Sequence, residues 1–219
     1  KAAKKLGLPL QVHIFTESDM EKILLKVVEL IEDPDPVKVG VGAAFYWNAQ
    51  KTAEAGYQVM LAGQGADELF GGYKRYIDEY ILNGEKAVRK TMFQDVSVID
   101  ESNIARDKKI CEYHDVELRL PFASFDLAKF AICLPAELKL EKSPDSLRKL
   151  VLRKTASKLG LPSEIAMKPK KAMQYSTGIN NVIRKLARSK NLTIVEYLNQ
   201  LFFAAKKDYR YIDFLVEEF

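Results

Sequence analysis

The stretch LAGQGADELFGGY, residues 61–73, places four glycines and an adjacent acidic pair directly after an apolar run. The run, residues 57–62, is typical of a buried strand, and a helix is predicted to begin near Ala66. Gly63 and Gly65 lack a Cβ, so the backbone there can adopt positive φ and approach a ligand closely. In open α/β sheets, ligands bind beyond the carboxyl ends of the strands, and N–H groups at a helix start attract anions. The stretch therefore predicts a strand-to-helix turn that binds an anionic ligand.

The acidic pair in this stretch, Asp67 and Glu68, admits two interpretations. Asp67 is placed to hold a magnesium ion that is shared with phosphate oxygens. Alternatively, both carboxylates cap the helix and complement its dipole. Spacing alone favours the second interpretation.

Helical patterns occupy most of the remaining chain. Ser18 and Glu21 form a capping-box pattern before a run of apolar residues with helical period, and Thr193 and Glu196 repeat the box near the end. Further helices are predicted over residues 41–55, 66–82, 84–97, 102–114, 125–133 and 145–159.

Three tyrosines, Tyr73, Tyr76 and Tyr80, follow the acidic pair at helical spacing. Residues three and four apart lie on one face of a helix. This spacing favours packing of the three rings over stacking on a ligand.

Only two stretches have the pattern of buried strands, residues 11–15 and 57–62. Helices separate them, which indicates an α/β fold with parallel strands. Parallel sheets are covered on both faces and normally contain several strands. Two strands do not make such a sheet, and the first predicted helix, residues 1–7, begins without a cap. The chain is therefore expected to begin in the middle of a fold.

The length, charge and cysteine content of the chain indicate which classes of protein it can belong to. The 219 residues suffice for one large domain, or for a domain with a helical annex. A net charge of +4 is too small to indicate a nucleic-acid partner. Cys111 and Cys133 lack metal-ligand spacing and fit a reducing compartment. No signal peptide and no apolar run long enough to span a membrane is present, so a cytoplasmic protein without a membrane partner is expected.

The segment GQGADELFGGYKRY resembles the SGEGADELFGGY signature of the synthetase domain of asparagine synthetases, in the PP-loop ATP pyrophosphatase superfamily. Further segments resemble that family in the same order, over about residues 1–180. They are Arg106-Asp107, Val116–Phe122, Leu134-Pro135 with Leu138-Lys139, Lys149–Arg153 with Leu161-Pro162, Lys168–Lys171 and Gln174–Gly178. Several motifs in order identify a family more specifically than one short pattern does.

The resemblance implies a fold and a division of the chain. Residues 1–95 would be the remaining part of a parallel-sheet α/β core of the PP-loop, adenine-nucleotide alpha-hydrolase-like type. Residues 96–219 would be a large helical portion of the same synthetase domain. The SGGxDS phosphate loop and the N-terminal cysteine of a glutaminase domain do not occur in this sequence. The 219 residues are therefore expected to be inactive alone.

The implied reaction is an ATP-dependent ligation. ATP adenylates the side-chain carboxylate of aspartate, and ammonia then displaces AMP to give asparagine. The substrates would be aspartate and ammonia, with the nitrogen supplied as free ammonia or by a separate glutaminase subunit. Assembly as a homo-oligomer stays open.

The resemblance also assigns residues. It places Asp67 at the magnesium ion, and Ala62, Gly63 and Gly65 at the nucleotide. A phosphate-contacting catalytic lysine would be Lys170, which the Lys-Pro-Lys sequence favours, or Lys171, which the run into residues 174–176 favours. The alternative for these lysines is a solvated basic loop, the usual fate of such runs.

Gln64 departs from the family pattern, because it stands where the family usually has a glutamate proposed to handle protons in the amine step. An amide cannot act as a base. Two alternatives to an asparagine synthetase therefore stay open. One is a sibling ligase with another carboxylate or amine, and the other is a non-catalytic nucleotide-binding or assembly relative.

Overall fold

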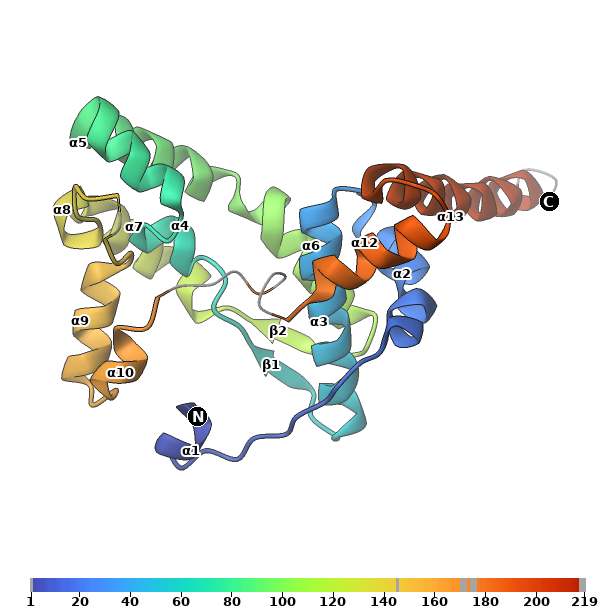
Figure 1. Cartoon of the computed structure of the whole chain (residues 1–219), viewed down its shortest axis with the longest axis horizontal. Helices are drawn as coiled ribbons and strands as arrows, with labels where there is room; N and C mark the ends of the chain where they lie inside the picture. The colour runs from blue at the N-terminus through green and yellow to red at the C-terminus, as the bar shows by residue number, and fades with distance from the viewer. Residues whose placement is uncertain (1, 145, 170–172, 174–176, 217–219) are drawn as a thin grey trace. The chain divides into compact units, whose positions relative to one another are not determined.

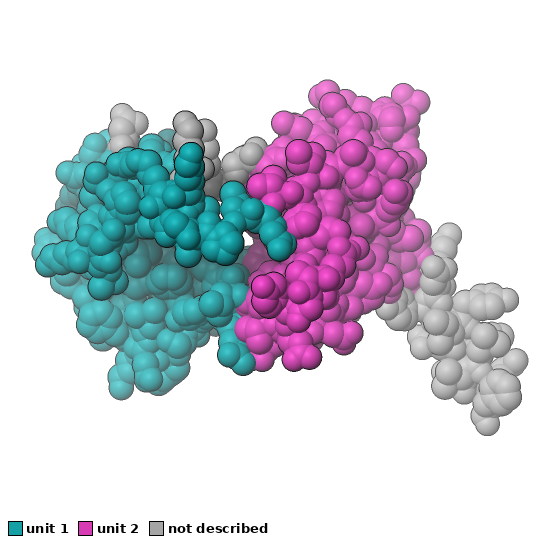
Figure 2. All heavy atoms as spheres, turned by 90° about the horizontal axis from the view of Figure 1, so that it is seen from below, with its two compact units in different colours: residues 1–11, 61–104, 119–170 teal, residues 12–60, 105–118, 171–219 magenta. Residues whose placement is uncertain are grey.

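The chain forms two compact units (Figure 2). The computed structural model describes residues 2–144, 146–169, 173 and 177–216, and for residues 102 and 207–216 it describes the backbone. The first unit comprises Lys1–Gln11, Leu61–Ile104 and Arg119–Lys170, and the second unit comprises Val12–Met60, Ala105–Leu118 and Lys171–Phe219. The predicted division between residues 95 and 96 falls inside helix α5 (Lys74–Ser97) and stays a prediction.

The first unit consists mainly of helices (Figure 1). They are α1 (Ala2–Lys5), α4 (Ala66–Phe70), α5 (Lys74–Ser97), α7 (Phe125–Cys133), α8 (Ala136–Lys139), α9 (Leu150–Lys158) and α10 (Ser163–Ala166), with a π-helical turn at Asp100–Ile104 and a 3-10 turn at Pro121–Ala123. Gly84 interrupts α5 with φ 80° and ψ −174°, which agrees with the break predicted between residues 82 and 84.

One core cluster of the first unit lies where α5 meets α8. Tyr76 and Tyr80 are buried in it together with Leu140, and Tyr73 packs against it. The prediction that these three tyrosines pack rather than stack on a ligand agrees with this arrangement. Tyr76 also donates its hydroxyl hydrogen to Asp95 Oδ2 at 2.5 Å. The pKa of Tyr76 is raised, mainly by burial and secondly by this hydrogen bond.

In the described part of the second unit, the helices are α2 (Glu17–Ile31), α3 (Pro36–Glu54), α6 (Ala105–Glu112), α12 (Ile179–Ser189) and α13 (Ile194–Val216). Its core includes Met20, Leu24, Val27 and Val28 from one face of α2, and all four are fully buried. That spacing is the helical period seen in the sequence. Along the described residues, no helix is both long and apolar enough to cross a membrane.

Of the two capping boxes predicted in the second unit, one is wrong and one is confirmed. The predicted capping box of Ser18 and Glu21 is wrong, because Thr16 caps α2 and exchanges hydrogen bonds with Asp19. Both pairs have the spacing of a capping box, so the sequence alone did not separate them. The second predicted box is confirmed: Thr193 N donates to Glu196 Oε2 at 2.8 Å, and Glu196 N donates to Thr193 Oγ1 at 3.2 Å.

The sheet of the described structure is small and parallel. It contains β1 (Val59–Leu61), inside the predicted strand, and β2 (Glu117–Arg119). The strand predicted at residues 11–15 is wrong as a paired strand, because this segment has no ladder partner in the described chain. Two of its apolar side chains are exposed, Val12 at 70% and Ile14 at 89%, whereas Phe15 is partly buried and stacks on Trp47. The mostly helical chain with its small parallel sheet is compatible with an α/β fold.

We predict that Tyr76→Phe destabilises the protein by about 1 kcal/mol, because it removes a hydrogen bond from a fully buried ring. Tyr80→Phe is the matched control, because Tyr80 is similarly buried and its hydroxyl has no hydrogen-bond partner in the described part of the chain. The measurement is urea unfolding of both variants. Equal losses of unfolding free energy would contradict a stabilising role of the contact between Tyr76 and Asp95.

Candidate functional site around Asp67

The predicted turn from strand to helix is present between β1 and α4. Ala62 N donates to Arg119 O at 3.1 Å, so the end of β1 is tied to β2. Gly65 adopts φ 90° and precedes α4, and a Cβ there would lie 3.0 Å from the carbonyl oxygen of Phe122. Gly63 has neither a positive φ nor an atom within 4 Å of a Cβ position. Of the two glycines, only Gly65 is therefore required by the local backbone.

Helix α4 is short. With only five residues, it sums few peptide dipoles, and a helix of this length is marginal by itself. An anion in front of α4 would therefore depend mainly on nearby cationic side chains for its stabilisation. Two such side chains contact α4 and the residues after it: Lys149 at Asp67, and Arg148 at Gly72 O.

Asp67 faces a lysine from a distant part of the chain. Lys149 Nζ lies 3.0 Å from Asp67 Oδ1, and the side chains are 20% and 27% exposed. Lys149 is the residue before α9 and adopts φ 60°, in the left-handed region that non-glycine residues seldom occupy. Gly65 occupies the cap position of α4, so Asp67 is not the cap residue, although it lies in the first turn, where a carboxylate complements the helix dipole.

The glycine pair at the end of α4 lets the chain pass beneath this ion pair. Gly72 N donates to Asp67 O at 2.7 Å, and Gly72 O accepts from Arg148 Nη1 at 3.1 Å. A Cβ on Gly72 would overlap with Asp67 Oδ1 and lie 2.6 Å from Lys149 Cε. Gly71 has φ 74°, and a Cβ there would lie 2.7 Å from a methyl group of Leu140. The glycines of the opening stretch thus bring backbone against Asp67.

Glu68, the second member of the acidic pair, has a different environment. It is 5% exposed, and it accepts hydrogen bonds from Tyr73 Oη at 2.6 Å and from Asn103 Nδ2 at 3.4 Å. Burial and the neighbouring Glu68 carboxylate raise the pKa of Tyr73. Glu68 therefore anchors α4 in the first unit, whereas Asp67 is directed at Lys149.

The residues around Asp67 decide what kind of magnesium site this turn could form. In the part of the chain that the structure describes, no group of three or more His, Cys, Asp or Glu side chains could hold a metal. Magnesium is usually held by one or two carboxylates together with phosphate oxygens and water. Asp67 can supply one carboxylate, whose Oδ1 already faces a cation. The residues therefore fit a magnesium ion that arrives with phosphate, and not a site built of protein ligands alone.

Lys149 is the residue that sequence reasoning missed. The segment Lys149–Arg153 was recognised as family-like, but no role followed for Lys149, because an ion pair with a residue 82 positions earlier leaves no local pattern. Arg153, on helix α9 just after Lys149, connects this helix to the chain after α10. Its Nη1 donates to Ala166 O and, at 2.9 Å, to Lys168 O, so α9 holds the start of the predicted lysine segment.

Some of the other predicted site residues lie at the turn, and others lie outside the described residues. Ala62 and Gln64 are partly exposed at the turn, and Gly63 is exposed. Lys170 and Lys171 lie outside the described residues. The described structure therefore brings Ala62, Gly63, Gln64, Gly65 and Asp67 into one turn.

We predict that Gly72→Ala destabilises the protein by about 1–3 kcal/mol, because the new methyl group would collide with the ion pair of Asp67 and Lys149. Gly63→Ala is the matched control, with an expected change within about 0.5 kcal/mol, because no atom lies within 4 Å of its Cβ position. Unfolding free energies measured in urea give the comparison. A Gly72→Ala variant as stable as the control would show that the ion pair can move aside.

Comparison with known proteins places the chain in a family. The family model of asparagine synthase matches residues 1–86 and 80–209. The chain is 34% identical over 233 residues to "Putative asparagine synthetase [glutamine-hydrolyzing] 1" of Methanocaldococcus jannaschii, which covers 92% of this chain and 43% of that protein.

Two more distant relatives agree with this placement. The chain is 31% identical over 144 residues to "Asparagine synthetase domain-containing protein 1" of Homo sapiens, covering 64% of this chain and 22% of the relative. It is 26% identical over 184 residues to "Asparagine synthetase [glutamine-hydrolyzing]" of Triphysaria versicolor, covering 82% and 30%. The chain thus spans less than half the length of these relatives. It belongs to the asparagine synthase family.

Proposed function

We propose that this chain carries the synthetase site of an ATP-dependent amidoligase. In the proposed reaction, the side-chain carboxylate of aspartate takes the adenylyl group of ATP, with release of pyrophosphate, and ammonia then displaces AMP to give asparagine. The observation that carries the proposal is the ion pair of Asp67 and Lys149 at a strand-to-helix turn. We also propose the PP-loop type of parallel-sheet core for residues 1–95, with residues 96–219 as the helical portion.

Asp67 would hold magnesium together with the phosphates of ATP. A bound magnesium ion supplies charge neutralisation for the departing pyrophosphate. A magnesium ion held by Asp67 would compete with the Lys149 ammonium for this carboxylate, whose Oδ1 faces Lys149. Lys149 would then be released to contact phosphate, and Arg148 lies beside it with one nitrogen on Gly72 O.

A second cation would come from the segment after residue 168. Lys170 or Lys171 is the proposed catalytic lysine. The hydrogen bonds from Arg153 to Ala166 O and Lys168 O support this placement, because they tie the start of the segment to α9. The residue before α9 is Lys149, so one helix would carry the first cation and anchor the chain that leads to the second.

The turn itself would contact the nucleotide. Ala62, Gly63 and Gly65 offer backbone to it, and Gln64 would line the pocket for the amine. Because an amide accepts no proton, the base in the amine step would be another group or the amine itself. This favours, as a second candidate, a sibling ligase with a different amine. Cytoplasmic location, and free ammonia or a glutaminase subunit as the nitrogen source, belong to the same proposal.

The decisive test is pyrophosphate release by the complete protein, and not by the 219 residues alone, with ATP, magnesium and aspartate. We predict that Asp67→Asn lowers the magnesium-dependent rate on the order of 100-fold and raises the magnesium concentration needed, because a charged contact to the reacting phosphates is lost. Near-normal release with an unchanged magnesium requirement would reduce Asp67 to a structural residue.

The choice of substrates distinguishes the candidates. Release that requires aspartate and forms asparagine with ammonia supports the proposed reaction. Release with another carboxylate or amine instead would identify a sibling ligase, and no release with any carboxylate would identify a non-catalytic relative. Circular dichroism of each variant serves as the control for folding.

We predict that Lys170→Ala and Lys171→Ala have very unequal effects on the same rate. One of the two lysines should contact phosphate, and its loss should lower the rate on the order of 100-fold. The other should be a solvated side chain with little effect. Two equally mild losses, measured side by side, would exclude both lysines from catalysis.

A further inference from the structure

Lys139, the last residue of α8, is buried and has no acidic partner among the residues that the structure describes. Its side chain is 3% exposed. It forms no hydrogen bond or ion pair with any residue that the structure describes. Lysine is almost never fully buried unless it is paired, because removing an ammonium group from water is costly.

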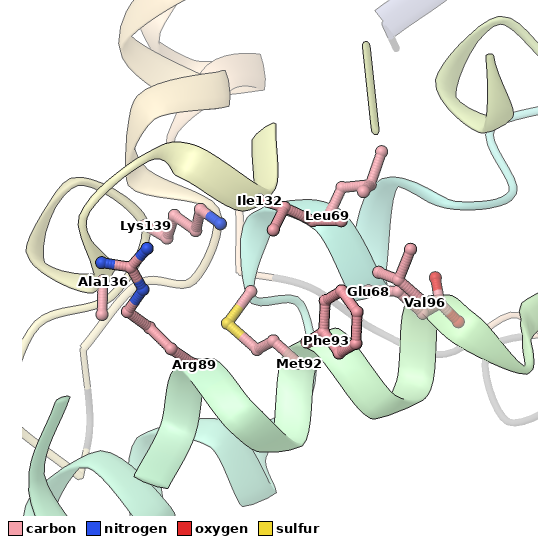
Figure 3. Close-up of a pocket in the computed structure, with 9 residues that line it drawn as sticks. All are labelled: Glu68, Leu69, Arg89, Met92, Phe93, Val96, Ile132, Ala136 and Lys139. Atoms are coloured by element: carbon pink, nitrogen blue, oxygen red, sulfur yellow. The ribbon is translucent and has the colours of Figure 1, made fainter. Parts of the chain in front are cut away.

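Lys139 borders a small, partly open cavity between α4, α5, α7 and α8 (Figure 3). The cavity has a volume of about 10 Å³, which is room for about one water-sized particle. Arg89 and Glu68 also line it, and the remaining lining side chains are apolar, among them Met92 and Ile132. Figure 3 shows the Lys139 amine directed over Met92 toward Ile132, inside this group.

Positive charge is concentrated at the end of the cavity where Lys139 lies. Figure 3 shows the guanidinium of Arg89 on the same side as Lys139, and the carboxylate of Glu68 at the opposite end of the group. Glu68 is already hydrogen-bonded to Tyr73 Oη at 2.6 Å. Arg89 has a long contact of 3.7 Å with Glu85, and both side chains are 46% exposed, so this pair contributes little. Two cations thus share one end of the cavity.

We propose that the cavity is a binding site for a single-atom anion of the chloride type, held between Lys139 and Arg89. A negative ion would compensate the buried ammonium and reduce its repulsion with the guanidinium, which a water molecule cannot do. The cavity is about the size of one water molecule, so the proposed occupant is a single-atom anion at the end of the cavity away from the Glu68 carboxylate.

The protonation of Lys139 couples this site to pH. Burial, and then the charge of Arg89, lower its pKa to about 8, while Cys133 of α7 acts in the opposite direction. A lysine with a lowered pKa destabilises the folded protein when the pH is below that value, because the unfolded chain holds the proton more readily. An anion offsets this destabilisation. Chloride should therefore stabilise the protein well below pH 8 and lose its effect well above pH 8.

The first test compares unfolding temperatures of the protein in sodium chloride and in sodium gluconate of equal ionic strength, so that general screening is the same. We predict that chloride raises the unfolding temperature of the wild type below pH 8. Lys139→Met should lose this difference, because it replaces the ammonium by an apolar chain of similar length. The matched control is Lys129→Met, at an exposed lysine on α7, and it should keep the difference.

The second test uses wild-type protein and does not depend on the folding of any variant. Crystals soaked in sodium bromide should show an anomalous peak beside Lys139 Nζ. Arg89→Gln should reduce that peak while leaving the buried lysine in place. The proposal is overturned if the wild-type crystals show no peak in this cavity. It is equally overturned if Lys139→Met responds to chloride as the wild type does.

Discussion

The contact between Asp67 and Lys149 is the interaction on which the candidate site depends. It joins α4 to the residue before α9. Lys149 occupies the left-handed region of the backbone, and a Cβ on Gly72 would overlap with the Asp67 carboxylate. A strained conformation of about 1 kcal/mol or more persists only where the surroundings hold it, and such positions concentrate at functional sites. The ion pair, the glycine pair and the start of α9 therefore form one arrangement.

Adjacent carboxylates can have opposite environments because a helix turns about 100° per residue. Asp67 and Glu68 illustrate this on the five residues of α4. Glu68 points into the first unit, where Tyr73 donates a hydrogen bond to it, and it is almost fully buried. Asp67 stays partly exposed beside Lys149. The acidic pair thus separates a buried, hydrogen-bonded carboxylate from a partly exposed one that is the proposed magnesium ligand.

The features that could be predicted from the sequence are those set by neighbouring residues in the chain. The turn after residue 62, the break in α5 at Gly84 and the cap at Thr193 each follow from short-range geometry, and the structure contains all three. The strand at residues 11–15 failed because a strand exists only when another strand pairs with it, and the pattern of one segment does not reveal the partner.

The remaining part of the site was not predictable for a related reason. Lys149 and Asp67 lie far apart in the sequence, with α5, α7 and α8 between them, and the left-handed backbone of Lys149 has no signature in residue type. Arg153 is similar, because its hydrogen bonds to Ala166 O and Lys168 O depend on where α10 ends. The family resemblance marked the segment that holds both residues, whereas their partners became visible only in three dimensions.

A helix as short as α4 cannot hold its own position, because the cost of starting a helix is not recovered over one turn. Its geometry must come from outside. Gly71 lets Leu140 pack against its end, Tyr73 and Asn103 bind Glu68, and Leu69 is buried in a core cluster of the first unit. Any change in this packing would move Asp67 relative to Lys149. The interior of the first unit is therefore part of what positions the proposed magnesium ligand, although none of these side chains would touch magnesium or phosphate.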